Sequence, residues 1–279
     1  MSEHGRMHVP GRDVASPLAT KPDLAGAPVQ DPDAQLPQLF PRVTSFRARR
    51  SRMSDKQQET WDRLWPELGQ QAWDAEGPAA LLDTRAWFGR DAPVVLEIGC
   101  GTGTSTLAMA QAEPDIDVVA VEVYRRGLAQ LLSAVDRTSH PGPASAPASM
   151  PVTNIRLIRG DGVDVLTYMF GPNSLTGVRV FFPDPWPKAR HHKRRLLQPA
   201  TVALIADRLR PGAVLHAATD HADYAAYIGE VGDANPRLRR VSTNCEGLPI
   251  SVVRPVTKYE GKAQHAGSAV AELLWEKTS

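Results

Sequence analysis

Five short runs of almost entirely apolar residues recur through the middle of the chain, and each is typical of a buried β-strand. They lie at 94–98, 117–123, 154–161, 177–182 and 213–220. Apolar residues with helical spacing fill the gaps, and they predict helices at 103–112, 124–136, 163–169, about 196–209 and 222–231. Because strands and helices alternate, we predict an α/β fold: a doubly wound, mostly parallel sheet with helices on both faces. Two or three further strands should complete the sheet, the last near 269–276.

Two stretches depart from this alternation. Residues 1–42 are rich in Pro, Ala, Asp and Gly and have no helical or strand periodicity, which predicts a disordered tail. Residues 138–152 form a low-complexity run of Pro, Ala and Ser. This run predicts a surface insertion within a single domain that spans 43–279.

The start of that domain combines positive charge with an amphipathic helix. Arginines stand at positions 47, 49, 50, 52 and 63. Trp61, Leu64, Trp65 and Leu68 share one face of the predicted helix. Two interpretations explain this pattern equally well. The helix could pack at the edge of the domain after a solvent-exposed basic segment, or this region could contact RNA.

Composition narrows the class of protein. The 279 residues carry a formal net charge of only +1, so any attraction to nucleic acid must come from local clusters. Two cysteines, Cys100 and Cys245, cannot build a disulfide framework or a four-ligand zinc site, which indicates a reducing compartment and no metal. No apolar run is long enough to span a bilayer, and the N-terminal residues lack the apolar core of a secretory signal. We expect a cytoplasmic protein without membrane or metal partners, and a monomer.

Each of the five predicted strands has an acidic residue at or just after its end. In chain order these residues are Glu97, Glu122, Asp161, Asp184 and Asp220. A single acid at such a position is usually a turn former or a helix cap. Parallel strands bring their carboxyl ends to one edge of the sheet, however, where ligands bind. Five acids on one edge therefore predict a ligand with cationic and hydrogen-bond donor groups.

A glycine-rich loop follows the first of these strands. Gly99, Gly101 and Gly103 have the spacing G-x-G-x-G, whereas the dinucleotide fingerprint is G-x-G-x-x-G. The loop with Glu97 therefore suits a nucleoside ligand without phosphates, notably S-adenosylmethionine, whose amino group and sulfonium are cationic. Glu122 is placed to accept both ribose hydroxyls, and Asp161 to lie near the adenine amine.

The stretch FFPDPWPKARHHKRR, residues 181–195, joins an acid to a run of cations. Asp184 stands between two prolines, which restrict its backbone. The residues that follow can neutralise phosphates or stack on bases of RNA, and they are Lys188, Arg190, His191, His192, Lys193, Arg194 and Arg195. A solvated loop is the alternative. Two adjacent histidines without a third ligand do not indicate a metal site.

On these residues, the chain resembles the bacterial tRNA (guanine-N7-)-methyltransferases of the class I S-adenosylmethionine-dependent fold. The resemblance covers about 43–279 and rests on residues 181–195, supported by VLEIGCGTG (95–103), AVEV (120–123), ATD (218–220) and RPVTKYE (254–260). It implies transfer of a methyl group from S-adenosyl-L-methionine to N7 of a variable-loop guanosine in tRNA.

The resemblance also implies roles for single residues. Cofactor contacts would fall on Glu97, Glu122, Asp161 and Asp184, with Asp184 as the active-site acid. Residues 190–195 would contact RNA. The remaining substrate contacts would fall on Lys188, Asp220, Thr257, Lys258, Tyr259 and Glu260.

Two aspects of function stay open at this stage. Guanine N7 carries a lone pair and needs no general base, so Asp184 could stabilise developing positive charge or orient the base through its N1–H and N2–H donors. A class I methyltransferase with another substrate, or a non-catalytic RNA-binding scaffold of the same fold, are the alternative functions.

Overall fold

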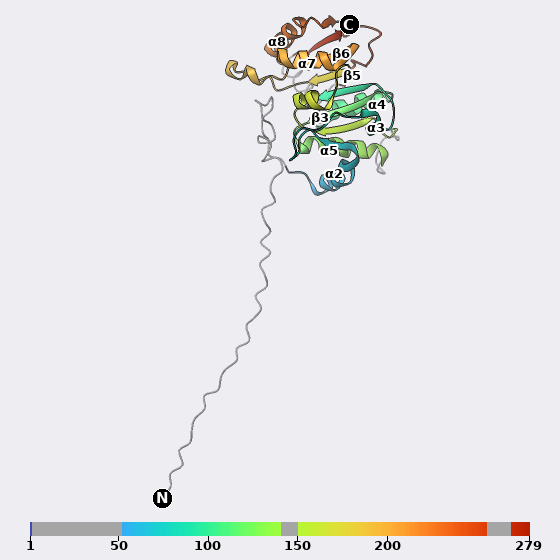
Figure 1. Cartoon of the computed structure of the whole chain (residues 1–279), viewed down its shortest axis with the longest axis vertical. Coiled ribbons are helices and arrows are strands. Elements are labelled where there is room, and N and C mark those ends of the chain that lie inside the picture. Colours follow the sequence, from blue (N-terminus) through green and yellow to red (C-terminus); the bar gives the residue numbers. More distant parts are fainter. Residues whose placement is uncertain (2–51, 141–149, 256–268) are drawn as a thin grey trace. The chain divides into compact units, whose positions relative to one another are not determined.

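The computed structural model describes Met1 and residues 52–140, 150–255 and 269–279 (Figure 1). The chain divides into two units, Met1–Gln30 and Asp31–Ser279, and every element below belongs to the second. Three predictions fall wholly or mostly outside the described residues: the tail at 1–42, the insertion at 138–152 and the set Thr257 to Glu260. The described ends of the insertion are ordered, since the backbone N–H of the buried Val152 donates to the Thr138 hydroxyl at 2.9 Å.

The strands of the described residues form one sheet in the order β1-β4-β3-β2-β5-β6-β8-β7. The strands are β1 (Gly69–Gln71), β2 (Val94–Ile98), β3 (Asp117–Glu122), β4 (Ile155–Arg159), β5 (Leu175–Phe181), β6 (Leu209–Thr219), β7 (Leu238–Val241) and β8 (Ala271–Lys277). β1 to β6 are mutually parallel, and β8 runs antiparallel to both of its neighbours. The prediction of a mostly parallel sheet is confirmed, with β7 and β8 as the expected late strands.

Helices cover both faces of the sheet. They are α2 (Asp55–Leu68), α3 (Thr84–Phe88), α4 (Thr104–Ala112), α5 (Arg125–Ser139), α6 (Gly162–Asp164), a π-helix (Val165–Met169), a 3₁₀-helix (Ala189–Arg194), α7 (Pro199–Arg208) and α8 (Ala222–Asp233). Alternate residues of β3 serve the two faces: Val118 and Ala120 pack in the core with α2 and α5, and Val119 and Val121 in the core with α7 and α8 (Figure 1). The doubly wound architecture is therefore confirmed.

The order of the strands fixes where a ligand can bind. From β2 the chain moves outward to β3 and β4, and it then crosses back to place β5 on the other side of β2. At such a reversal the connections leave in opposite directions, which opens a crevice beyond the carboxyl ends of the two central strands. The glycine loop follows β2, and Asp184 follows β5.

Several boundaries differ from the prediction for local reasons. The predicted helix at 163–169 is a three-residue turn of α-helix followed by a π-helix. β6 begins at Leu209 rather than at the predicted 213, so the strand includes Pro211 and Gly212. Proline is tolerated there because the pairing of β5 with β6 shifts register between Leu175 and Gly177, and the ladder bond that Pro211 cannot make is absent. β1 and α3 were not predicted, because neither carries a strong apolar period.

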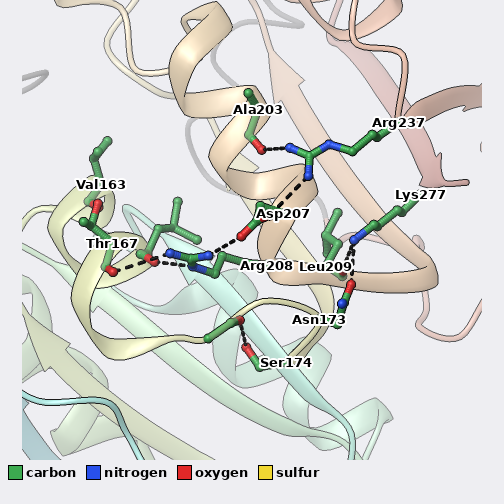
Figure 2. Close-up of polar contacts among 12 residues, drawn as sticks. Val163, Thr167, Asn173, Ser174, Ala203, Asp207, Arg208, Leu209, Arg237 and Lys277 are labelled. Atoms are coloured by element: carbon green, nitrogen blue, oxygen red, sulfur yellow. Dashed lines mark hydrogen bonds and ion pairs between the residues drawn. The ribbon is translucent and has the colours of Figure 1, made fainter. Parts of the chain in front are cut away.

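A polar network connects elements at the end of the sheet opposite the ligand crevice (Figure 2). Arg208 at the end of α7 donates to the Leu166 carbonyl of the π-helix at 2.7 Å, and it forms an ion pair with Asp207. Lys277 at the end of β8 donates to the Leu209 carbonyl at 2.6 Å and to the Asn173 side chain at 2.7 Å. These bonds join α7, the π-helix and β8 far from the crevice, so we assign them to the stability of the fold.

Candidate active site

The five predicted acids lie at the carboxyl edge of the parallel strands, but in different environments. Glu97, Glu122 and Asp161 are buried, Asp184 is half-buried and Asp220 is exposed. The five acids therefore lie on the predicted edge, and the structure adds their different burial, which the sequence pattern does not indicate. Buried carboxylates need partners, and the partners found differ for each of the three.

Glu122 holds the glycine loop against the start of α5. Its Oε2 accepts from the backbone N–H of Gly101 at 3.0 Å, and its Oε1 accepts from those of Val123 at 2.7 Å and Tyr124 at 3.0 Å. Glu122 therefore has a structural role in addition to any ligand contact.

The three loop glycines all have positive φ, but they serve different purposes. A Cβ at Gly99 (φ 79°) or Gly101 (φ 58°) would meet nothing within 4 Å, so both glycines border open space. A Cβ at Gly103 (φ 75°) would lie 2.5 Å from Leu131 Cδ1 of α5. Gly103 is therefore needed for packing, whereas Gly99 and Gly101 leave room on the crevice side.

Close approach of α5 to this loop requires one more glycine that the sequence pattern did not single out. A Cβ at Gly127 would lie 2.3 Å from the Gly101 carbonyl oxygen. Cys100 lies in the same loop, and burial raises the pKa of its thiol well above the ordinary value. The charges of Glu122 and Glu97 act in the same direction. Cys100 is therefore an inert part of the loop at neutral pH.

Glu97 lies at the base of the crevice with an incomplete set of partners. Burial raises its pKa, while the charge of Arg179 and the hydroxyl of Thr106 act to lower it. Arg179 stands directly opposite Glu97 on β5 and is itself fully buried, where its Nη2 donates to Glu113 at 2.6 Å. Among the described residues, Glu97 Oε2 has no hydrogen-bond partner of normal geometry. A buried carboxylate oxygen in this state suits a cationic or donor group of a ligand.

Asp161 begins the loop after β4 as the N-cap of α6. Its Oδ1 accepts from the backbone N–H of Val163 at 2.9 Å, and the residue is buried at the crevice edge. Asp161 therefore acts as a helix cap, which is the usual role of a single acid at the end of a strand.

The loop that carries Asp184 is bounded by two residues in the left-handed region. Phe182 has φ 50° and Trp186 has φ 44°, which is uncommon for bulky side chains and costs about 1–3 kcal/mol each. The backbone N–H of Phe182 donates to the Ala218 carbonyl at 2.8 Å, and Trp186 is buried. Strain of this kind persists where surrounding contacts determine the conformation, and it is typical of active-site loops.

The basic segment after this loop forms the 3₁₀-helix and its flanks. Lys188, Arg190 and Lys193 are exposed, and His191 and His192 are half-buried. The His191 ring lies edge-on to Trp186, with centroids 5.8 Å apart. The Arg194 guanidinium lies over the same indole, 4.9 Å from its centroid. Trp186 thereby links the geometry of the acid loop to the cationic surface.

Comparisons with known proteins show which family the chain belongs to. A family model described as "Putative methyltransferase" matches residues 91–273. The tRNA (guanine-N(7)-)-methyltransferase of Mycolicibacterium gilvum (strain PYR-GCK) is 71% identical over 278 residues, which cover 100% of both chains. This chain belongs to the tRNA (guanine-N(7)-)-methyltransferase family. The family member of Mycolicibacterium vanbaalenii is 69% identical over 287 residues, with 100% of both chains covered. An aminoglycoside resistance methyltransferase of solved structure is 14% identical, with a TM-score of 0.44 over 74% of this chain and 98% of that one.

Members of this methyltransferase family use S-adenosyl-L-methionine as methyl donor, and the crevice fits that molecule. Open space lies above Gly99 and Gly101, the Glu97 Oε2 is an unsatisfied acceptor, and Glu122 and Asp161 stand along the same edge. A cationic amino acid end and a hydroxyl-bearing ribose are the groups that such a set of acceptors can bind.

One predicted RNA contact of the tRNA methyltransferase needs correction. The Arg195 side chain is only 1% exposed, and its guanidinium pairs with Asp223 and donates to the Pro185 carbonyl at 3.0 Å. A phosphate has no access to it in this structure. A run of cations in a sequence does not reveal which member turns inward, because the burial comes from α8, 28 residues further along the chain.

The remaining predicted substrate residues are Asp220 and the set Thr257 to Glu260. Asp220 is exposed at the end of β6, on the same edge as the other acids. Thr257, Lys258, Tyr259 and Glu260 lie outside the described residues. Among residues 52–140, 150–255 and 269–279, no helix combines the length and the apolar character needed to cross a membrane.

Proposed function

We propose that this chain transfers the methyl group of S-adenosyl-L-methionine to N7 of a guanosine in the variable loop of tRNA. The observation that carries the proposal is the junction at 183–195, where an acid on a strained loop at the crevice is followed directly by an exposed basic segment. A polyanionic substrate and a cationic cofactor would meet at such a junction. Relatives that bear this activity as their name match the whole chain.

The crevice residues would hold the cofactor in a defined orientation. Glu97 would accept from the amino group, Glu122 from the ribose hydroxyls and Asp161 from the adenine amine. The backbone of Gly99 and Gly101 would let the ligand approach closely. When bound, the cofactor supplies a methyl group on a positively charged sulfur, which guanine N7 can attack without losing a proton first.

Asp184 would act on the guanine at the moment of transfer. Positive charge moves onto the purine as the N7–methyl bond forms, and a fixed carboxylate nearby stabilises that charge. The same carboxylate can instead accept hydrogen bonds from guanine N1–H and N2–H, which orients the base. An amide in place of the carboxylate separates these roles, because an amide oxygen still accepts one hydrogen bond but carries no charge.

The exposed and half-buried residues of the basic segment would hold the RNA. We propose phosphate or base contacts for Lys188, Arg190, His191, His192, Lys193 and Arg194. Each cation that neutralises a phosphate should add about 0.7–0.9 to the magnitude of the salt slope, which is the slope of the logarithm of the binding constant against the logarithm of the salt concentration. Asp220, Thr257, Lys258, Tyr259 and Glu260 remain proposed substrate contacts. We propose that this reaction on tRNA takes place in the cytoplasm. We also propose that the protein is a monomer. A mass of 30.3 kDa by sedimentation would support a monomer, and twice that mass would contradict it.

Methyl transfer from a radiolabelled donor tests the function. The enzyme is incubated with labelled S-adenosyl-L-methionine and unmodified bulk tRNA, and the RNA is digested to nucleosides. Label in 7-methylguanosine supports the proposal. Label in another nucleoside would redirect it to a different tRNA modification, and absence of label with intact tRNA binding would favour a non-catalytic scaffold.

A further inference from the structure

Arg195 lies beneath the loop that carries Asp184 rather than on the surface. Its Nε donates to the carbonyl of Pro185 at 3.0 Å, and Pro185 directly follows Asp184. Its Nη2 pairs with the carboxylate of Asp223 in the first turn of α8. The planar guanidinium therefore connects α8 to the peptide that follows Asp184. A guanidinium has several donors in a fixed fork and can make both contacts, whereas a single ammonium group cannot.

Two tyrosines of α8 hold this guanidinium in place. The centre of the guanidinium lies 4.8 Å from the Tyr224 ring centroid and 5.2 Å from that of Tyr227. The Tyr224 hydroxyl accepts from the backbone N–H of Leu197 at 3.2 Å, and the Tyr227 hydroxyl donates to Gln198 Oε1 at 2.7 Å. The helix thus fixes both Arg195 and the chain that follows it.

The loop needs such support because its backbone is unfavourable on both sides of Asp184. Phe182 and Trp186 have φ of 50° and 44°, and the Pro185 carbonyl lies between them. A hydrogen bond from a buried, positively charged donor at that point opposes relaxation of the loop. The Asp184 carboxylate itself remains half-buried and makes none of these bonds, so it stays available to the crevice.

We propose that Arg195 is a positioning residue for methyl transfer: it fixes the direction of Asp184 through the Pro185 carbonyl, and it does not contact tRNA. This inference rests on the proposed function for its catalytic consequence. Its structural part, the order of the 182–187 loop, stands independently. An RNA-binding role and a positioning role for Arg195 predict different kinetic effects.

Kinetics of two Arg195 variants separate these roles. Arg195→Met keeps the stem between the tyrosine rings but removes every donor, and Arg195→Lys keeps the charge but not the fork. For both we expect kcat to fall by about 10²-fold, while the KM and Kd for tRNA stay within about twofold, because a small misplacement of a catalytic group is costly. Full activity of Arg195→Lys, or weaker tRNA binding with a lower salt slope for Arg195→Met, would overturn the proposal.

Lys193→Gln is the matched control, since Lys193 is an exposed cation two residues earlier on the same segment. It should weaken tRNA binding and lower the salt slope by about 0.7–0.9, the effect expected of a phosphate contact. Asp223→Asn is a second probe with small risk to folding, because the Asp223 side chain is 62% exposed. It should lower kcat less than Arg195→Met does, because the bond to Pro185 remains.

Hydrogen exchange of the backbone tests the structural part without reference to activity. In Arg195→Met, peptides that cover 182–195 should exchange faster than in the wild type, and peptides from β2 and β3 should be unchanged. Unchanged exchange at 182–195 would contradict the positioning role. If the wild-type enzyme transferred no methyl group at all, the proposed function would fail while this exchange result would still decide the role of Arg195.

Discussion

At the scale of single residues, the acids of the crevice differ because their surroundings differ. Glu97 is buried next to Arg179, and burial raises its pKa. Glu122 accepts three backbone hydrogen bonds. Asp184 is half-buried on a loop bounded by strained residues. The first two acids are therefore built into the framework of the site, whereas Asp184 is the acid that we propose to act on the reacting groups.

Asp184→Asn and Asp184→Ala test the charge of this residue. We expect Ala to reduce kcat at least 10²-fold, because the lost electrostatic stabilisation is of the size measured for single oxyanion-type contacts. If stabilisation of charge dominates, Asn should be as inactive as Ala; if orientation of the base dominates, Asn should retain more activity. The melting temperature and the affinity for S-adenosyl-L-methionine are the controls. Turnover near that of the wild type in Asp184→Ala would contradict the assignment.

Residue types in the sequence placed the acids at the ends of the strands, but they did not show which cations are exposed. The role of Asp184 stays a prediction, which rests on the prolines that restrict its backbone on both sides. Arg195 could not be told from Arg194, since the two are adjacent and only the contacts with Asp223, Tyr224 and Tyr227 separate them. Arg179 and Gly127 were missed because an arginine inside an apolar strand and a glycine inside a helix carry no periodic signal.

At the scale of elements, the glycine loop combines a packing requirement with an open face. Gly103 approaches Leu131 of α5 so closely that no side chain fits, whereas Gly99 has open space beside it. Both glycines have positive φ, so strain from a new side chain is similar at the two positions. Any difference between substitutions at Gly99 and Gly103 therefore reports the surroundings of each glycine rather than its backbone conformation.

Alanine at these two positions should have separable effects. Gly99→Ala should lower the free energy of unfolding by about 1–2 kcal/mol through strain alone, and it should weaken binding of S-adenosyl-L-methionine by placing a methyl group in the crevice. Gly103→Ala should cost about 1–3 kcal/mol more because of overpacking against Leu131. Urea unfolding and calorimetric titration measure the two quantities. A smaller loss of stability for Gly103→Ala than for Gly99→Ala would be inconsistent with this packing.

Tyr224 of helix α8 should make the free energy of unfolding depend on pH in the alkaline range. Burial raises the pKa of Tyr224 from its ordinary 10.0 to about 12, against the opposing hydrogen bond from Leu197 and charge of Arg195. The folded state thus favours the neutral phenol, and its contribution to stability, of about 2–3 kcal/mol, is complete below pH 10 and is lost as pH rises to about 12.

Unfolding of Tyr224→Phe in denaturant at several pH values checks this dependence. Below pH 10 the variant should be less stable than the wild type by about 1–2 kcal/mol, since the Leu197 N–H loses its acceptor. Toward pH 12 the difference should vanish and then reverse, because the wild type loses about 2–3 kcal/mol whereas phenylalanine has no proton to lose. Parallel stability curves for the two proteins would show that Tyr224 does not titrate as described.

Element positions were predictable where apolar periodicity is strong. All five central strands were found within a few residues, because strands buried on both faces leave continuous apolar runs. The π-helix and the early start of β6 were not found. Both depend on tertiary contacts: Arg208 donates to the Leu166 carbonyl of the π-helix, and the register shift between β5 and β6 accommodates Pro211.

At the scale of the whole molecule, the parallel sheet gathers residues that are distant in sequence at one edge. The glycine loop after β2 and the acid loop after β5 meet there because the strand order reverses between these strands. The shared edge was predictable from the alternation of strands and helices, whereas the neighbouring positions of β2 and β5 come from the strand order, which the alternation does not give. The network around Arg208 and Lys277 stabilises the opposite edge, so changes there should affect stability rather than chemistry (Figure 2).

The most direct test of the account replaces the attacking atom. Two tRNA transcripts are compared, one with guanosine and one in which 7-deazaguanosine replaces guanosine, so that a carbon stands where N7 was and the other edges of the base remain. Each is incubated with the enzyme and S-adenosyl-L-methionine, and methylated nucleosides are identified by mass spectrometry alongside a tRNA-binding measurement. The account predicts 7-methylguanosine in the first transcript, no methylated nucleoside in the second, and similar affinity for both. Methyl transfer to the 7-deaza transcript, or a methylated nucleoside other than 7-methylguanosine in the first, would contradict it.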